Sequence, residues 1–236
     1  MITLAFDTSA KIASCAVLDG SRALASYSID NGLTQSELIM PMAESMLASL
    51  KLKFSDIELI ATSVGPGSFT GVRIGVSMAK GLAFGKNIPI SHVSTLEALA
   101  ENLFPFEGIL APCMDARRSQ VYNALFECDG KKIKRLTEDR AISLIDLFAE
   151  LSAYGDRKNY LSGDGYEVAS KALEAAQIKF EKTPAALIPE NAVSVGLVGQ
   201  RMHIEGLSVS DTELLPTYLR LPQAERERLE RQKATK

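Results

Sequence analysis

A glycine-rich turn between an apolar strand and a helix has the clearest chemical potential in this sequence. Residues 59–64 are apolar enough for a buried strand, the turn of residues 65–67 follows, and a helical pattern begins near Ser68 or Thr70. Such a helix start exposes free backbone N–H groups and the positive end of the helix dipole, which together attract anions. The turn lacks the Gly-Lys-Ser/Thr ending of a P-loop, and its glycines are spaced one residue too widely for a dinucleotide motif. It is therefore either an anion site or a tight turn that lets the helix pack closely.

Asp7, which ends the first apolar strand, is the second residue with potential for chemistry. A carboxylate in this position can hold Mg²⁺ while a flexible hairpin loop wraps phosphate groups. The loop after Asp7 contains no glycine, so its backbone approaches a phosphate less readily than a glycine-bearing loop does. Asp7 is thus either a nucleotide or magnesium contact, or a turn and capping residue. The candidate nucleotide-binding residues are Asp7, Thr8, Ser9, Gly65 and Gly67.

The remaining reactive residue types form no catalytic or metal-binding pattern. The three cysteines, Cys15, Cys113 and Cys128, are widely spaced in apolar, strand-like surroundings, where burial disfavours a reactive thiolate. The two histidines, His92 and His203, are too far apart in sequence for a two-histidine helix motif. We therefore predict no catalytic residue and no metal site in this chain, and reduced thiols in the cytoplasm.

The composition is that of an ordinary globular protein. The 236 residues are 46% apolar and 23% charged, enough to bury a full core. The formal net charge of -3 argues against strong independent binding to nucleic acid, because neutralising phosphates requires a concentrated basic face. No apolar run is long enough to span a bilayer, and the apolar start lacks the basic region of a signal peptide. The sequence predicts a cytoplasmic protein without membrane contact, which meets RNA mainly through a partner.

The order of predicted elements is written twice along the chain. Each half begins with an antiparallel meander of three strands and continues with alternating helices and strands, which add parallel strands to a sheet. Equivalent acidic strand ends and glycine turns recur in both halves. We expect an α/β protein with two lobes, residues 1–104 and 105–221, that face a shared cleft. Residues 222–236 form a charged tail.

This duplicated plan resembles the superfamily of actin, sugar kinases and heat-shock chaperone ATPases, in which two ribonuclease-H-like lobes face one another. Further segments narrow the resemblance to the TsaB family, also called YeaZ: residues 5–9, 35–38 with Pro41, 65–75, 114–118 and 216–220. The likeness covers the chain to about Leu221 and is most specific in the first lobe. Gln35 departs from the family, which often has histidine there, and this argues further against a metal.

Membership of this family implies a non-catalytic scaffold and activator subunit. The family acts with its paralogue TsaD, which carries the metal and transfers the threonylcarbamoyl group, and with the ATPase TsaE. Together they install N6-threonylcarbamoyl on the adenosine 3′ to the anticodon of tRNAs that read codons beginning with A. The resemblance implies that this chain needs no cofactor of its own, while ATP or ADP with Mg²⁺ are candidates in the complex. An intrinsic ATPase activity stays open at this stage.

Two helices of the first half carry more apolar surface than one buried face requires. The helix expected at residues 35–50 begins with capping-box spacing at Thr34 and Glu37, and its apolar arc covers about 200°. The helix expected at residues 70–84 has two apolar stripes, one of them with a ridge of small residues that lets another helix approach closely. The predicted partner-binding residues are Leu38, Ile39, Met42, Met46, Gly71, Val72, Gly75, Val76 and Ala79.

The resemblance assigns this surface to TsaD in a heterodimer, and to a second copy of the chain when TsaD is missing. On pattern alone, the alternative is that both helices are sandwiched between the lobes. Bulky replacements of Gly75 and Ala79 are predicted to abolish binding to TsaD while the fold stays intact. The competing function is a stand-alone small-molecule kinase or ATPase of the same superfamily, which would act without a partner.

Overall fold

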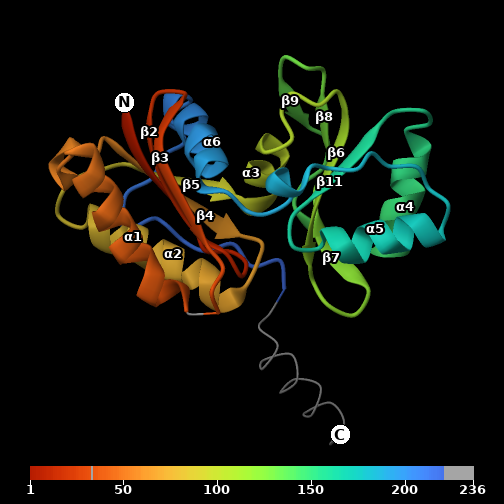
Figure 1. The fold of residues 1–236 in the computed structure, drawn as a ribbon, viewed down its shortest axis with the longest axis horizontal. Helices are drawn as coiled ribbons and strands as arrows, with labels where there is room; N and C mark the ends of the chain where they lie inside the picture. Colours follow the sequence, from red (N-terminus) through yellow and green to blue (C-terminus); the bar gives the residue numbers. More distant parts are fainter. Residues whose placement is uncertain (33, 221–236) are drawn as a thin grey trace, which may run out of the picture.

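The chain forms two α/β lobes side by side (Figure 1). The computed structural model describes residues 1–32 and 34–220, so the charged tail predicted at residues 222–236 lies outside the described residues. Within the described part, no helix combines the length and the apolar character that a membrane span needs.

The first lobe is built on a five-stranded sheet with the order β3-β2-β1-β4-β5. The strands β1 (Ile2–Asp7), β2 (Ala13–Asp19) and β3 (Arg22–Ile29) form the expected antiparallel meander. The strands β4 (Leu59–Gly65) and β5 (Ile90–Ser94) then add in parallel. This is the ribonuclease-H-like plan that the element order predicts.

Helices cover both faces of the first sheet (Figure 1). Helices α1 (Gln35–Leu50) and α2 (Phe69–Ala83) pack on the face that carries Leu4 and Phe6, and a single turn, η1 (Phe54–Asp56), follows α1. Because side chains alternate along a strand, Ala5 faces the opposite side, where α6 (Ala192–Ile204) packs. The first sheet is therefore buried on both faces.

The second lobe repeats the plan in a reduced form. Its strands are β6 (Gly108–Asp115), β7 (Gln120–Asn123), β8 (Phe126–Cys128), β9 (Ile133–Arg135), β10 (Arg140–Ser143) and β11 (Asn159–Ser162). Strand β6 takes the place of β1: it pairs antiparallel with β7 and β8, which stand where β2 stands in the first lobe, and parallel with β11. The counterpart of β5 in this lobe is reduced to an isolated parallel bridge between Tyr160 of β11 and Glu181.

The second sheet is covered on one face by α4 (Leu144–Ala153) and α5 (Tyr166–Ala175), and a short turn, η2 (Ala185–Leu187), leads towards α6. Its other face packs against α3 (Thr95–Glu101), whose Leu96 and Leu99 share a core with Leu110, Met114 and Phe126. The last helix of the first half therefore lies between the lobes and covers the sheet of the second.

Each half of the sequence therefore supplies a helix to the sheet of the other half, because α6, from the second half, covers the sheet of the first lobe. Gly196 and Gly199 of α6 allow this close approach: a Cβ at Gly196 would lie 2.5 Å from Cδ1 of Leu18, and one at Gly199 would lie 2.6 Å from Cβ of Ala61. The chain also returns to the first sheet at Val209, which bridges to Ile90. The predicted second lobe of residues 105–221 is therefore corrected: α6 and the segment up to Val209 pack against the sheet of the first lobe, although they follow the second sheet in the sequence.

Candidate functional site

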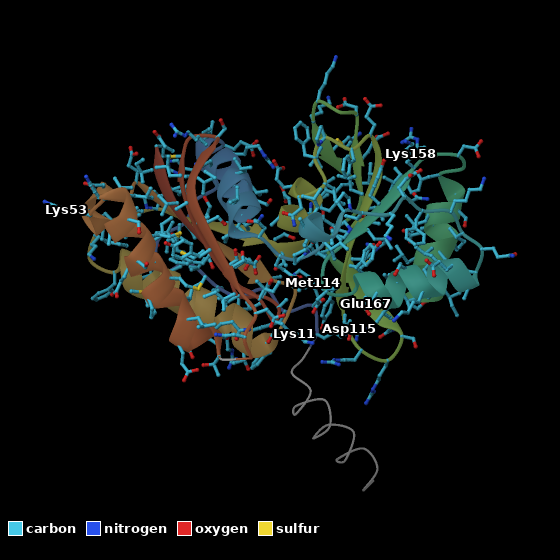
Figure 2. The ribbon with its side chains drawn as sticks, viewed as in Figure 1. Lys11, Lys53, Met114, Asp115, Lys158 and Glu167 are labelled. Carbon is cyan, nitrogen blue, oxygen red and sulfur yellow. The ribbon has the colours of Figure 1, made fainter. Side chains whose placement is uncertain are left out.

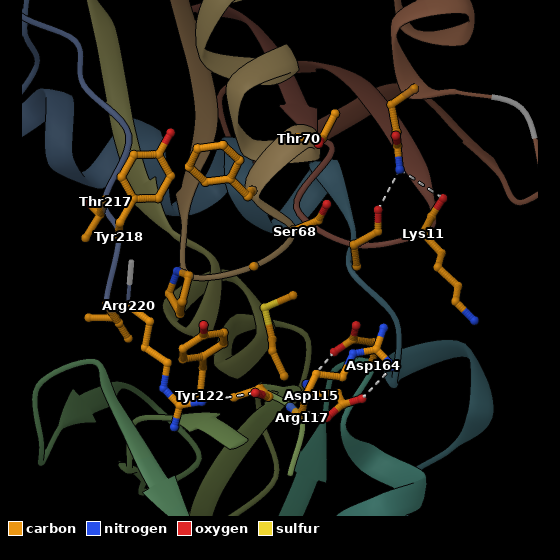
Figure 3. A pocket seen from close by; sticks show the side chains of 18 residues that line it. Lys11, Ser68, Thr70, Asp115, Arg117, Tyr122, Asp164, Thr217, Tyr218 and Arg220 are labelled. Carbon is orange, nitrogen blue, oxygen red and sulfur yellow. Dashed lines mark hydrogen bonds and ion pairs between the residues drawn. The ribbon is translucent and has the colours of Figure 1, made fainter. Parts of the chain in front are cut away.

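A cleft of about 500 Å³ opens between the two lobes, as the sequence predicts (Figure 3). Figure 2 shows Lys11 of the first lobe next to Met114 and Asp115 of the second, whereas Lys53 lies at the outer end of the first lobe and Lys158 lies on the second lobe away from this junction. The polar residues that line the cleft are Lys11, Gln35, Ser68, Thr70, Asp115, Arg117, Tyr122, Asp164, Thr217, Tyr218 and Arg220.

The end of the cleft where a phosphate would sit is closed by the protein's own backbone. The loop after Asp7 packs directly on the start of α2: the Ser68 N–H donates to the Ser9 carbonyl at 2.6 Å, and Thr8 Oγ1 donates to the Gly71 carbonyl at 2.7 Å. A Cβ at Gly71 would lie only 1.9 Å from the Thr8 oxygen. Gly67 and Gly71 therefore allow the loop after Asp7 to pack closely on the start of α2. This close contact leaves no room for a phosphate group between the loop and the helix.

This geometry corrects the placement of the candidate nucleotide-binding residues. Asp7, Thr8, Ser9 and Gly65 are buried away from the cleft, and of the five only Gly67 lines it. Gly65 has φ +114, and a Cβ there would lie 2.5 Å from the Thr217 carbonyl oxygen. The turn therefore needs glycine in order to seat the C-terminal segment, a use that the strand–turn–helix pattern alone does not reveal.

Three carboxylates lie near the junction of the lobes. Asp7 accepts hydrogen bonds from the N–H and the hydroxyl of Ser9 through Oδ1, while its buried Oδ2 has no partner among the described residues. Burial raises the pKa of Asp7 and of Asp164. Burial, followed by repulsion from Asp7 and Asp164, raises the pKa of Glu190 to about 8. In residues 1–32 and 34–220, no three such side chains converge closely enough to hold a metal ion.

The second-lobe wall of the cleft is fixed by hydrogen bonds among its own acidic residues. Asp164 Oδ1 accepts from the Asp115 N–H at 2.9 Å, and Glu190 Oε1 accepts from the Asp164 N–H at 3.2 Å. Arg117 contacts Asp115 through its backbone N–H at 2.8 Å and through its guanidinium at 3.7 Å. Each of these carboxylates therefore uses one oxygen to hold the turn.

The C-terminal segment of residues 214–220, which we term the strap, crosses from one lobe to the other along the cleft. The Thr217 N–H donates to the Val64 carbonyl at 2.7 Å in the first lobe. Arg220 donates to the Ala116 carbonyl at 3.0 Å and to Gln120 Oε1 in the second lobe, and its guanidinium lies over the Tyr122 ring (Figure 3). The strap thus fastens the two lobes to each other.

Most predicted partner-binding residues face inwards. Leu38 is half-buried, while the other eight are buried in the core of the first lobe: Ile39, Met42, Met46, Gly71, Val72, Gly75, Val76 and Ala79. A Cβ at Gly75 would lie 2.7 Å from Thr8 Oγ1 and 3.0 Å from Thr62 Oγ1. The small-residue ridge of α2 therefore packs against β4 and the loop after β1 of the same chain. The expected orientation of this ridge is corrected, and bulky residues at positions 75 and 79 would disturb the fold itself.

The outward surface lies on the other stripe of the same two helices. An open groove of about 590 Å³ runs between α1 and α2, and its lining is mainly apolar. Its residues are Ser36, Ile39, Met40, Phe69, Thr70, Arg73, Ile74, Ser77 and Met78. Two signals in the sequence point to it: the second stripe of α2, with Ile74 and Met78, and the flexible methionines that suit an adaptable contact. The groove meets the cleft at Phe69 and Thr70, which line both.

The strand order and the two lobes define the class of this protein: a two-lobed α/β protein with the fold of actin, sugar kinases and heat-shock chaperone ATPases. A structure from Pseudomonas aeruginosa, described as an uncharacterized protein with similarity to peptidase YEAZ, matches with a TM-score of 0.77. It has 24% sequence identity, and the match covers 93% of this chain and 99% of that one. The component A of (R)-2-hydroxyglutaryl-CoA dehydratase from Acidaminococcus fermentans shares the fold at a TM-score of 0.52 and 11% identity, over 86% of this chain and 99% of that one.

Sequence comparison specifies the class further. The family model described as TsaD, tRNA N6-adenosine threonylcarbamoyltransferase, matches residues 34–227. The tRNA threonylcarbamoyladenosine biosynthesis protein TsaB of Bacillus subtilis is 33% identical over 99% of this chain and 100% of its own length. The TsaB protein of Escherichia coli is 30% identical over 93% of this chain and 95% of its own. The chain belongs to the TsaB family, also called YeaZ.

Proposed function

We propose that this chain is the non-catalytic scaffold and activator subunit of a tRNA-modifying complex. With TsaD and TsaE it would support N6-threonylcarbamoylation of the adenosine 3′ to the anticodon in tRNAs that read codons beginning with A. The observation that carries the proposal is the contrast within the first lobe, where the phosphate end is closed and an apolar groove is open. The first lobe therefore offers a surface for a protein and no space for a phosphate group.

The groove supports a protein partner because it offers contact area without reactive groups. Met40, Ile74 and Met78 are half-buried and give the groove its apolar walls. Covering apolar surface of this kind contributes roughly 25 cal/mol per Å² removed from water. Methionine side chains adapt to the shape of a partner, which suits a helix packed into a groove between two helices.

TsaD is the partner that fits best. The family model that matches most of this chain carries the name TsaD, so the two proteins share sequence features over this region. Related folds can pair through equivalent helices about an approximate twofold axis, and a second copy of this chain can use the same surface when TsaD is absent. ATP or ADP with Mg²⁺ would then belong to the complex, and tRNA would be bound mainly by the partner, because this chain carries a net charge of -3.

The competing function is a stand-alone small-molecule kinase or ATPase. It requires space for a phosphate between the loop after Asp7 and the turn at Gly67, and the Ser68–Ser9 hydrogen bond of 2.6 Å fills that space. Purified chain is therefore expected to hydrolyse ATP at a negligible rate. Rapid turnover by the isolated chain would overturn the proposal.

Met78→Asp tests the proposed surface. A carboxylate in the groove would be desolvated under a partner helix, so binding to TsaD is expected to fall at least about 100-fold. The measurements are titration of TsaD by calorimetry and the content of modified adenosine in tRNA. Ile145→Asp is the matched control, because Ile145 is 79% exposed on α4 of the other lobe. Unchanged binding by Met78→Asp, or full TsaD activity without this chain, would contradict the proposal.

A further inference from the structure

One cation stands in the otherwise uncharged groove between α1 and α2. Arg73 of α2 is exposed and lines the groove, and no acidic residue lines it beside Arg73. Among residues 1–32 and 34–220, the Arg73 guanidinium makes one hydrogen bond, through Nε, and neither of its terminal nitrogens has a hydrogen-bond or ion-pair partner. A guanidinium left without a counter-charge in an apolar setting is a feature that a partner can complete.

Arg73 is held in place by two aromatic rings. Its guanidinium carbon lies 3.8 Å from the centroid of the Phe69 ring, and its Nε donates to the Tyr218 hydroxyl at 2.8 Å. The rings of Phe69 and Tyr218 are themselves in contact, with centroids 4.9 Å apart. The strap therefore supplies one of the two groups that orient this side chain, and Figure 3 shows Tyr218 beside the start of α2.

This arrangement restrains the Arg73 side chain at an exposed position and leaves its two terminal nitrogens as a pair of unused donors. Such a planar fork matches the two oxygens of a carboxylate, which a lysine ammonium cannot do. Because Phe69 and Tyr218 already restrict the side chain, less conformational entropy is lost when a partner binds than for a free surface arginine. Cover by a partner helix would also exclude water and strengthen the pair.

We propose that Arg73 determines the specificity of the groove by binding a carboxylate of the partner subunit, with Tyr218 as its positioning residue. The carboxylate comes from an Asp or Glu on the apolar face of a helix that fills the groove beside Met40, Ile74 and Met78. This inference rests on the proposed function and adds to it the chemistry by which the partner is recognised. A purely apolar helix would leave the cation buried and unpaired, which is strongly unfavourable.

The test titrates TsaD into the full chain and its variants. Arg73→Glu is expected to weaken binding about 100-fold, and Arg73→Lys about 10-fold because the planar fork is lost. Tyr218→Phe keeps the ring but removes the hydroxyl acceptor, and is expected to weaken binding about 3-fold. Arg22→Glu is the matched control, since it makes the same change of charge at an exposed position of β3. Arg73→Glu is further expected to bind better to one TsaD variant in which a single interface carboxylate is replaced by Arg.

The outcomes separate this inference from the function on which it rests. If Met78→Asp abolishes binding while Arg73→Glu binds as the unmodified chain does, the carboxylate site is wrong and the docking surface stands. If both variants bind normally, the proposed function itself fails. An equal loss for Arg22→Glu would mean that net charge is responsible, and a loss confined to self-association would assign the groove to a second copy of this chain. Either result would overturn the inference.

Discussion

The two lobes follow one plan and differ in what they leave on their outer surfaces. In the first lobe, the turn before α2 packs on the loop after β1, where a Cβ at Gly67 would lie 2.4 Å from the Ser9 carbonyl oxygen. In the second, α5 begins on the end of β6, where a Cβ at Gly165 would lie 2.8 Å from the Cys113 oxygen. Both glycine turns thus bring the start of a helix against the end of a neighbouring strand or the loop that follows it. Since both lobes need the turn for packing, the turn by itself does not indicate a ligand.

The difference that matters for function lies further along the helices. The groove between α1 and α2 is apolar and carries Arg73, whereas α4 and α5 leave the single exposed residues Ile145 and Val168. Isolated apolar residues are normal on a protein surface, but an apolar groove is typical of a binding surface. Duplicated lobes can therefore diverge on the outside while the inner packing is retained.

The largest expected effect comes from adding a side chain at a glycine where α2 packs closely on the loop after β1. Gly71→Ala is expected to lower the free energy of unfolding by about 4 kcal/mol, because the new Cβ would overlap the Thr8 carbonyl. Gly81→Ala on the same helix is the control: a Cβ there meets nothing within 4 Å, so better helix propensity should stabilise the protein by up to about 1 kcal/mol. Urea unfolding measures both. A small effect of Gly71→Ala would show that the start of α2 can move away from the Thr8 carbonyl to accommodate a side chain.

The carboxylates between the lobes provide the second test. The pKa of Glu190 is raised to about 8, so the folded state binds this proton more tightly than the unfolded chain does. The free energy of unfolding is therefore expected to fall by about 3 kcal/mol as the pH rises from 5 to 8. Glu190→Gln, measured by urea unfolding across this range, should remove most of that decline. Glu174→Gln, at an exposed position of α5, should retain this decline, and an unaltered decline in Glu190→Gln would contradict the assignment.

The smallest effect is expected where the strap reaches the second lobe. Arg220→Ala removes hydrogen bonds to Ala116 and Gln120 and the contact with Tyr122, and should cost about 1 to 2 kcal/mol. Hydrogen exchange should become faster in the strap and at residues 116–122, while α4 keeps its protection. Arg118→Ala, an exposed residue of the same region, is the control. Equal exchange in both variants would mean that the strap is held from the first lobe alone.

Much of the fold was predictable because strand and helix periods are local properties. The meander, the parallel additions and the duplicated order all follow from residue patterns, and the structure confirms them. The reciprocal exchange of α3 and α6 was not predictable, because element order does not say which of two adjacent sheets a helix will cover. The small residues around Gly196 indicate close packing on a sheet, but they do not indicate which of the two sheets lies beside the helix.

The site was predictable only in outline. The sequence predicts an apolar excess on α1 and α2, and the structure has an apolar groove between these helices. A helical period gives the angle between two stripes, but it does not say which stripe faces the sheet. Gly75 suits a partner helix and a strand equally well, and the oxygens of Thr8 and Thr62 decide in favour of the strand. The link between Arg73 and Tyr218 spans 145 residues, so no local pattern reveals it.

The helix α6 also has a consequence for the order of events during synthesis. It completes the core of the first lobe by covering Ala5, Ala16 and Ala61, yet it is encoded after the whole second sheet. A ribosome must therefore expose residues 192–204 before the first lobe can close. Until then, one apolar face of an early sheet stays uncovered and prone to aggregation. A chain terminated just before α6 would therefore contain every strand named above and still leave one face of the first sheet uncovered.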